Sequence, residues 1–115
     1  MGWLSTHVLD VANGRPAGGI RITLRRADDG ALLAEVVTNA DGRTAAPLLQ
    51  DEALQAGRYE LRFEAGAYFR AQGLTLPDPA FLDEVVIRFG VADPAAHYHV
   101  PLLLSPWSYS TYRGS

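Results

Sequence analysis

The stretch HYHVPLLLSPWSYSTYRGS, residues 97–115, decides the fold expected for this chain. Its first eight residues alternate between two kinds of side chain, as in a β-strand, where successive side chains point to opposite faces. One set is bulky and apolar and is expected to face a core: Tyr98, Val100, Leu102 and Leu104. The other set carries two of the three histidines and is expected on the opposite face: His97, His99, Pro101 and Leu103.

The rest of the chain repeats this pattern. Residues 20–25 and 58–64 alternate with a period of two, and further extended segments at 3–10, 31–38 and 83–91 are separated by turn-rich stretches. Helical signals are limited to residues 65–73 and, more weakly, 51–57. Short strands at this close spacing predict one antiparallel β-sandwich domain over residues 1–115, with an open barrel as the alternative.

Composition excludes several classes of function. The 115 residues contain no cysteine, which rules out a disulfide framework, a thiolate metal site or a cysteine nucleophile. The net charge is −3 with no run of like charge, so neither a nucleic-acid partner nor a membrane surface is expected. The start MGWLSTHVLD has no secretory pattern, and no apolar stretch approaches the roughly 20 residues of a membrane helix. The sequence therefore predicts a soluble, cytoplasmic protein.

The third histidine lies in the first extended segment, WLSTHVLD. If Val8 points to the core, His7 points outward together with Ser5 and Leu9. A single exposed histidine is most often just a solvated residue. Several histidines beside leucine and proline on an outer sheet face are instead typical of an interface that contains a site.

Two roles are open to these histidines. His7, His97 and His99 could form a three-histidine zinc site, although the H-x-H spacing is weakly specific. General acid–base catalysis on water fits better, because the ordinary pKa of histidine lies near neutrality and no G-x-S-x-G or S-x-x-K nucleophile motif is present. Arg43 and Arg113 are candidates to bind a planar carbonyl, although each alone is more often a surface residue.

Three segments carry a family resemblance: LSTHVLD at residues 4–10, TNADGRTAAPLL at 38–49, and the closing residues 97–115. They resemble the signature segments of 5-hydroxyisourate hydrolases, the transthyretin-related enzymes of urate breakdown. The resemblance covers nearly the whole chain. The final Tyr-Arg-Gly-Ser is the feature that separates these enzymes from the hormone carrier transthyretin.

The resemblance implies an all-β, transthyretin-like (prealbumin-like) sandwich of two four-stranded sheets with one short helix. It also implies a homotetramer, a dimer of dimers, whose active sites lie where outer sheet faces of different subunits meet. The implied reaction is hydrolysis of a cyclic amide of 5-hydroxyisourate to 2-oxo-4-hydroxy-4-carboxy-5-ureidoimidazoline, with no metal and no cofactor.

The resemblance also implies which residues of this chain form the site. The catalytic set implied is His7, Arg43, His99 and Ser115, and the substrate-binding set is His7, Arg43, Tyr112, Arg113 and Gly114. The two histidines would activate water and move its proton to the ring nitrogen, in an order that the sequence leaves open. Arg113 has a second possible role besides substrate binding. Its side chain alternates away from that of Tyr112 and could brace the terminus instead.

Two other functions remain as alternatives. A non-catalytic, transthyretin-like carrier of small ligands would use the same scaffold, because a fold does not determine a function. A structural sandwich module would have no pocket at all. Convergence of His7, Arg43 and His99 on one place would favour the enzyme, and their dispersal would favour the structural module.

Overall fold

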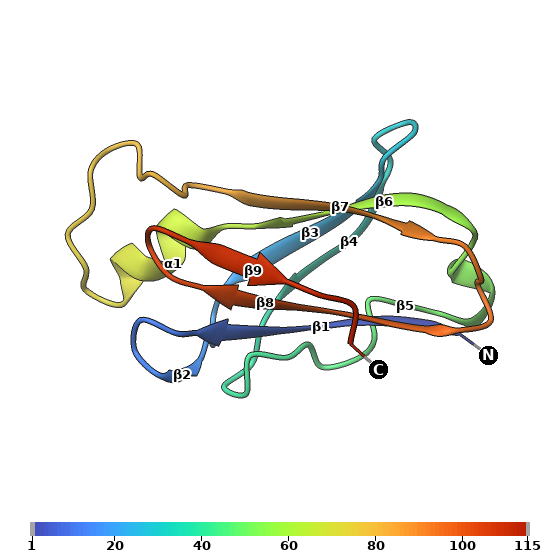
Figure 1. The fold of residues 1–115 in the computed structure, drawn as a ribbon, viewed down its shortest axis with the longest axis horizontal. Coiled ribbons are helices and arrows are strands. Elements are labelled where there is room, and N and C mark those ends of the chain that lie inside the picture. Colours follow the sequence, from blue (N-terminus) through green and yellow to red (C-terminus); the bar gives the residue numbers. More distant parts are fainter. Residues whose placement is uncertain (1, 115) are drawn as a thin grey trace.

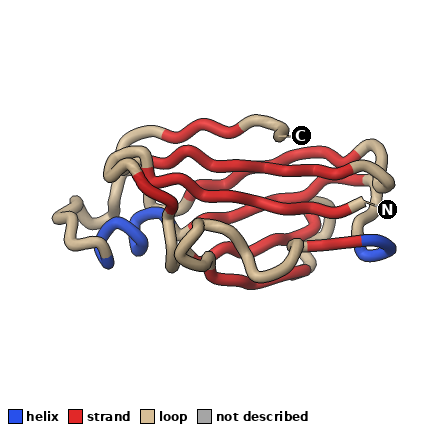
Figure 2. The backbone as a smooth tube through the Cα atoms, turned by 90° about the horizontal axis from the view of Figure 1, so that it is seen from below, coloured by secondary structure: helices blue, strands red, loops and turns tan. Residues whose placement is uncertain are grey.

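The computed structural model describes residues 2–114, which form two β-sheets packed face to face. Figures 1 and 2 show the two layers and the strands running along the long axis of the molecule. The first sheet has the order β2-β1-β8-β9, with β5 also paired to β1. Its strands are β1 (Trp3–Asp10), β2 (Arg15–Pro16), β5 (Leu49–Gln50), β8 (His97–Leu104) and β9 (Tyr109–Thr111). The two short strands β2 and β5 share one edge of β1, so this sheet has four positions.

The second sheet has the order β4-β3-β6-β7 and forms the other layer. Its strands are β3 (Arg21–Arg26), β4 (Leu32–Val37), β6 (Gly57–Phe63) and β7 (Val85–Val91). The helix α1 (Ala65–Ala71) follows β6 at one end of the sandwich, and a short 3-10 helix, η1 (Asp51–Ala53), lies at the other end. Within residues 2–114, no helix is long and apolar enough to cross a membrane. The prediction of a sandwich with one short α-helix is confirmed, and the open-barrel alternative is wrong.

One strand pair departs from the antiparallel prediction. β1 and β8 run parallel over their full lengths, in a register that aligns Trp3 with His97 and Asp10 with Leu104. A hairpin would make neighbours antiparallel, but these strands lie at opposite ends of the chain, so no tight turn dictates their direction. This parallel pair brings the N-terminal and C-terminal segments of the chain side by side (Figure 1).

The core lies between the sheets and is formed by the alternating apolar positions of both. Tyr59, Leu61 and Phe63 of β6 are fully buried, as are Leu102 and Leu104 of β8. The set of residues 98, 100, 102 and 104 predicted to face inward is buried throughout. Because the side-chain period of a strand is two, burying this set directs the intervening residues of β8 to the outside of the sandwich.

A buried carboxylate joins β1 to the helix. Asp10, at the end of β1, is fully buried and accepts hydrogen bonds from the Tyr68 hydroxyl of α1 at 2.8 Å and from the Asn13 side chain at 2.7 Å. Burial, together with the Asp10 carboxylate, raises the pKa of Tyr68 to about 12. These bonds compensate the cost of burying the carboxylate and hold α1 against the turn that follows β1.

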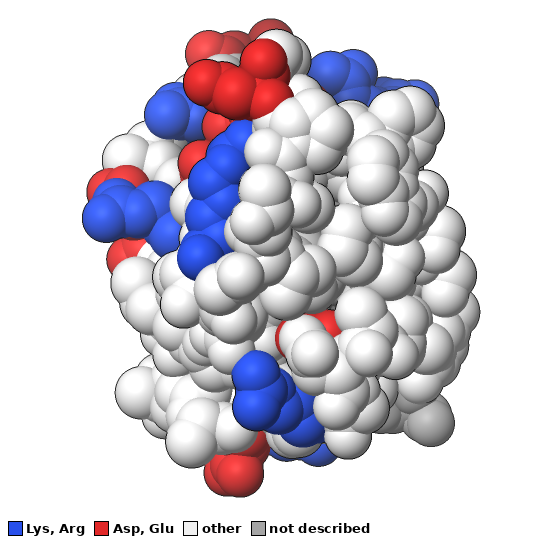
Figure 3. All heavy atoms as spheres, turned by 90° about the vertical axis from the view of Figure 1, so that its left-hand side faces the viewer, with Lys and Arg blue, Asp and Glu red and all other residues white. Residues whose placement is uncertain are grey.

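The outer faces of the two sheets differ in character. On the second sheet, ion pairs occupy the surface: Arg21–Glu35 and Arg88–Glu60 between strands, Arg62–Glu60 within β6, and Arg62 with Glu84, the residue before β7. Seen from the end where α1 lies, acidic and basic side chains are interleaved on part of the molecule, and a wide area carries no charge (Figure 3). The outer face of the first sheet instead carries the histidines of β1 and β8.

Candidate active site

The parallel pairing of β1 with β8 places His7 and His99 on one outer face. Ser5 is aligned with His99, and His7 with Pro101, so the two histidines are diagonal neighbours on adjacent strands. Both are half-buried. Their side chains share a face because inward-pointing Thr6, Val8 and Val100 are buried at the intervening positions.

Arg43 reaches the same place from a turn. Asn39 and Arg43 close this turn with a backbone hydrogen bond, and Arg43 forms an isolated antiparallel bridge with His7. Gly42 makes the approach possible: its φ is +75°, a Cβ there would collide with the carbonyl oxygen of Val8, and its own carbonyl accepts from Val8 N–H at 2.8 Å. His7 therefore has β8 on one side and Arg43 on the other.

A backbone carbonyl settles the tautomer of His7. Its Nε2 lies 2.8 Å from the carbonyl oxygen of Asp41. A carbonyl oxygen can only accept, so Nε2 carries a proton and donates. When His7 is neutral, its lone pair is therefore on Nδ1, and the hydrogen bond holds the ring against the turn that carries Arg43.

His99 is held on two sides. Its Nδ1 lies 2.8 Å from the Ser5 hydroxyl, and its ring packs over Gly114, where a Cβ would come within 2.6 Å of Cδ2. Burial, followed by the positive charges of Arg43 and His7, lowers the pKa of His99 below its ordinary value of 6.5. At neutral pH, His99 is therefore mainly in the neutral form that can accept a proton.

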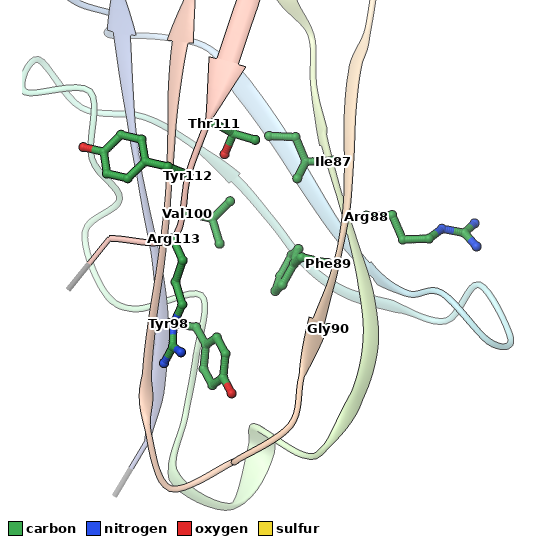
Figure 4. A pocket seen from close by; sticks show the side chains of 9 residues that line it. All are labelled: Ile87, Arg88, Phe89, Gly90, Tyr98, Val100, Thr111, Tyr112 and Arg113. Atoms are coloured by element: carbon green, nitrogen blue, oxygen red, sulfur yellow. The ribbon is translucent and has the colours of Figure 1, made fainter.

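The C-terminal segment runs back along β8. Gly114 bridges to His99 and donates from its N–H to the His99 carbonyl at 2.7 Å. Tyr112 has 60% of its surface exposed. In Figure 4 its side chain points away from that of Arg113. Ser115, which belongs to the catalytic set predicted from the sequence, lies outside the described residues.

Arg113 contacts its own chain. Its guanidinium lies over the ring of Tyr98, 4.1 Å from the centroid, and donates to the carbonyl oxygen of His97 at 2.9 Å. Figure 4 shows this side chain beside Tyr98. This contact is the one expected of a brace for the terminus, and the substrate-binding role of Arg113 stays a prediction.

The remaining histidine is separate from this pair. His97 stacks on Trp3, with ring centroids 3.4 Å apart. Among residues 2–114, no three histidine, aspartate or glutamate side chains gather closely enough to hold a metal ion. The alternative of a three-histidine zinc site therefore has no counterpart in this arrangement.

Two hollows lie near these residues. One, of about 210 Å³, opens beside Arg43 and is lined by Ser5 and Thr6 of β1 and by residues 44–47. Another, of about 220 Å³, opens between the sheets at β7 and is lined mainly by apolar side chains such as Ile87 and Phe89 (Figure 4). Tyr112 and Arg113 line the second hollow, whereas His7 and His99 line neither hollow. The two histidines lie instead on the outer face of the first sheet.

The structure adds two groups to the site predicted from the sequence. The Asp41 carbonyl fixes the tautomer of His7, and the Ser5 hydroxyl contacts His99. The alternation of β1 already placed Ser5 on the same face as His7, but the pairing with β8 that brings it to His99 is non-local. Together, a neutral imidazole, a second imidazole and an arginine can activate water and stabilise the anion formed by its addition to a carbonyl.

Comparison with known proteins identifies a family. Residues 4–114 match the model of the HIUase/Transthyretin family. The 5-hydroxyisourate hydrolase of Ralstonia nicotianae is 62% identical over 117 residues, covering 100% of both chains. The solved structure of Klebsiella pneumoniae 5-hydroxyisourate hydrolase is 41% identical with a TM-score of 0.84, covering 100% of both chains. A crystal structure of (S)-allantoin synthase is 47% identical with a TM-score of 0.95; the match covers 99% of this chain but only 44% of that one.

Proposed function

The chain belongs to the HIUase/transthyretin family, and we propose that it hydrolyses 5-hydroxyisourate in urate degradation by attack of a histidine-activated water on a cyclic amide. The observation that carries the mechanism is the convergence of His7, Arg43 and His99 on one outer sheet face. A relative that matches this chain along its whole length is named 5-hydroxyisourate hydrolase, and this supports the proposed substrate. The product is 2-oxo-4-hydroxy-4-carboxy-5-ureidoimidazoline.

His99 is the general base in this proposal. Its lowered pKa keeps it neutral at pH 7, and its position on β8 leaves it accessible from the open face. It takes a proton from water as the water oxygen adds to the amide carbonyl carbon. The same lowered pKa makes the resulting imidazolium ready to release that proton to Nδ1 of His7.

Arg43 stabilises the negative charge that develops on the carbonyl oxygen. Its guanidinium is permanently charged and presents several N–H donors in a plane, which suits a planar carbonyl. It also lies close enough to His99 to lower that histidine's pKa. A donor held in place before the reaction stabilises the tetrahedral anion without reorganisation.

His7 completes the proton transfer. Its Nε2–H is held by the Asp41 carbonyl, so the Nδ1 lone pair accepts the proton that His99 took from water and passes it to the ring nitrogen as the C–N bond breaks. Tyr112 positions the substrate ring by a hydrogen bond, and Gly114 leaves room for the His99 ring. The role of Ser115 stays a prediction from the resemblance.

We also propose that the protein acts as a homotetramer, a dimer of dimers. Leu9 and Leu103 are half-buried on the same outer face as the histidines, so part of that face is apolar. A second copy over this face would cover the leucines and enclose the site, which strengthens its electrostatic interactions by excluding water. Light scattering coupled to size-exclusion chromatography tests this, and a monomer at working concentration contradicts it. A cytoplasmic location stays a prediction of the sequence.

The activity is tested by an ultraviolet time course. Urate oxidase generates 5-hydroxyisourate in the cuvette, and its decay is followed with and without the protein in the presence of a chelator. We expect clear acceleration, and a kcat lowered about 10²-fold or more in His99→Asn, as for the loss of a general acid–base. His97→Asn is the matched control, because His97 lies on the same strand but stacks on Trp3. Decay at the spontaneous rate with folded protein would favour the non-catalytic carrier.

A further inference from the structure

We propose that Ser5 is a positioning residue for His99: its hydroxyl accepts the hydrogen bond from Nδ1–H, which leaves the Nε2 lone pair free to take the proton of water. This inference rests on the proposed function, because it assigns an orienting group to the proposed base. Ser5 itself touches no reacting atom in this scheme. It acts only through the ring of His99.

The contact is built into the pairing of the two strands. Ser5 and His99 are 94 positions apart in sequence, yet they face each other in the parallel register of β1 and β8, with Oγ and Nδ1 2.8 Å apart. Both residues are half-buried and lie inside their strands rather than at frayed ends. The backbone ladder therefore sets the position of the hydroxyl, and little side-chain freedom is lost in forming the bond.

Gly114 limits the ring from the opposite side. The Cδ2 edge of His99 packs against the Cα of Gly114, so closely that an added Cβ would lie 2.6 Å away. Turning the ring over would place Nδ1 against this apolar carbon and remove its hydrogen bond with Ser5. With Nδ1 on Ser5 and Cδ2 on Gly114, the outer edge of the ring, which contains Nε2, is directed away from the strand.

The direction of the hydrogen bond follows from the chemistry required. A serine hydroxyl can donate or accept, so it is compatible with either neutral tautomer of histidine. When His99 takes a proton from water, both ring nitrogens carry hydrogen, and Nδ1–H then needs an acceptor. Ser5 Oγ is in place to accept it. The charged groups facing His99, namely Arg43 from its turn and His7 from β1, both disfavour the imidazolium, so an acceptor at Nδ1 offsets part of their effect.

The test compares Ser5→Ala with Ser5→Thr, which keeps the hydroxyl. Thr6→Val is the matched control: Thr6 is the next residue of β1, but its hydroxyl points inward and donates to the Val100 carbonyl. We expect Ser5→Ala to lower kcat about 10- to 100-fold with little change in KM, the scale for a misplaced catalytic group. We expect Ser5→Thr to recover most of this loss. Thr6→Val should lower the melting temperature and leave kcat within about twofold of the wild type.

Nuclear magnetic resonance provides a readout that does not depend on activity. The ¹⁵N shifts of the His99 ring should report a proton on Nδ1 in the neutral wild type, and its titration should shift to lower pH in Ser5→Ala because the imidazolium loses an acceptor. A His99 titration that shifts to higher pH in Ser5→Ala would mean that Ser5 donates, and would overturn the inference. A kcat within twofold of the wild type in Ser5→Ala, or a covalent acyl group trapped on Ser5, would overturn it as well.

The activity assay and the NMR measurement separate the proposed hydrolase function from the proposed role of Ser5. If the wild type fails to accelerate the decay of 5-hydroxyisourate, the proposed function fails, whereas the ring shifts still show whether Ser5 holds the Nδ1–H tautomer. If the wild type is active and the shifts place the proton on Nε2, the positioning role of Ser5 fails and the hydrolase assignment stands.

Discussion

Replacing Gly114 by alanine tests whether the position of the His99 ring determines the rate. Gly114 has no backbone conformation that requires glycine, since its φ lies outside the left-handed region. Alanine can therefore adopt the same backbone, and the change in the free energy of unfolding should stay below about 1 kcal/mol. Any effect on catalysis then comes from the added methyl group and not from loss of the fold.

The size of the displacement follows from the contact distances. The new Cβ would lie 2.6 Å from Cδ2 of His99 and 3.2 Å from both Cβ and Cγ, whereas ordinary contact begins at 3.4 Å. The ring edge must therefore move by about 0.8 Å, the difference between 3.4 and 2.6 Å. Because Ser5 contacts the opposite edge of the ring, a shift of this size compresses or bends the 2.8 Å contact with Ser5. Misplacement of a catalytic group by about 1 Å can cost on the order of 10²-fold in rate.

The assay is the decay of 5-hydroxyisourate, with kcat and KM measured separately and the melting temperature recorded for each variant. We expect Gly114→Ala to lower kcat about 10- to 100-fold with a melting temperature close to that of the wild type. Gly90→Ala is the control, because nothing lies within 4 Å of a Cβ at that position and its φ is not positive. If Gly114→Ala and Gly90→Ala have the same kcat, the position of the His99 ring does not limit the rate and the reasoning is refuted.

Tyr68→Phe removes the hydroxyl that donates to the buried Asp10 carboxylate at 2.8 Å, and urea unfolding should show a loss of about 1.5–3 kcal/mol, the range for a hydrogen bond to a charged group. Burial and the Asp10 carboxylate raise the pKa of Tyr68 from its ordinary value of 10.0 to about 12. The resulting stabilisation is therefore present below pH 10 and lost as the pH rises through about 12, so the wild type and Tyr68→Phe should approach the same free energy of unfolding in that range. A difference in free energy of unfolding that stays constant with pH contradicts this. Arg43→Gln removes a charge that lowers the pKa of His99, so the acid limb of the plot of kcat/KM against pH should move to higher pH. An acid limb that stays at the same pH argues against an effect of Arg43 on the pKa of His99.

The amino-acid sequence determined the faces of the strands. Burial of Tyr98, Val100, Leu102 and Leu104 follows from a period of two that any extended backbone imposes, whatever its neighbours are. The placement of His7 and His99 away from the core is a consequence of the same local rule. Arg43 and Arg113 are candidates from their residue type, and the family resemblance, through three segments of this chain, adds Tyr112, Gly114 and Ser115 as site residues.

The tertiary structure decided which of these residues meet. Alternation along a strand says which face a side chain takes, but not which strand lies beside it or in which direction that strand runs. The parallel register of β1 and β8 brings Ser5 to His99, and the bridge between His7 and Arg43 brings the turn at residues 39–43 to β1. These contacts depend on backbone hydrogen bonds and core burial between segments far apart in the chain, and a local pattern carries no information about such partners.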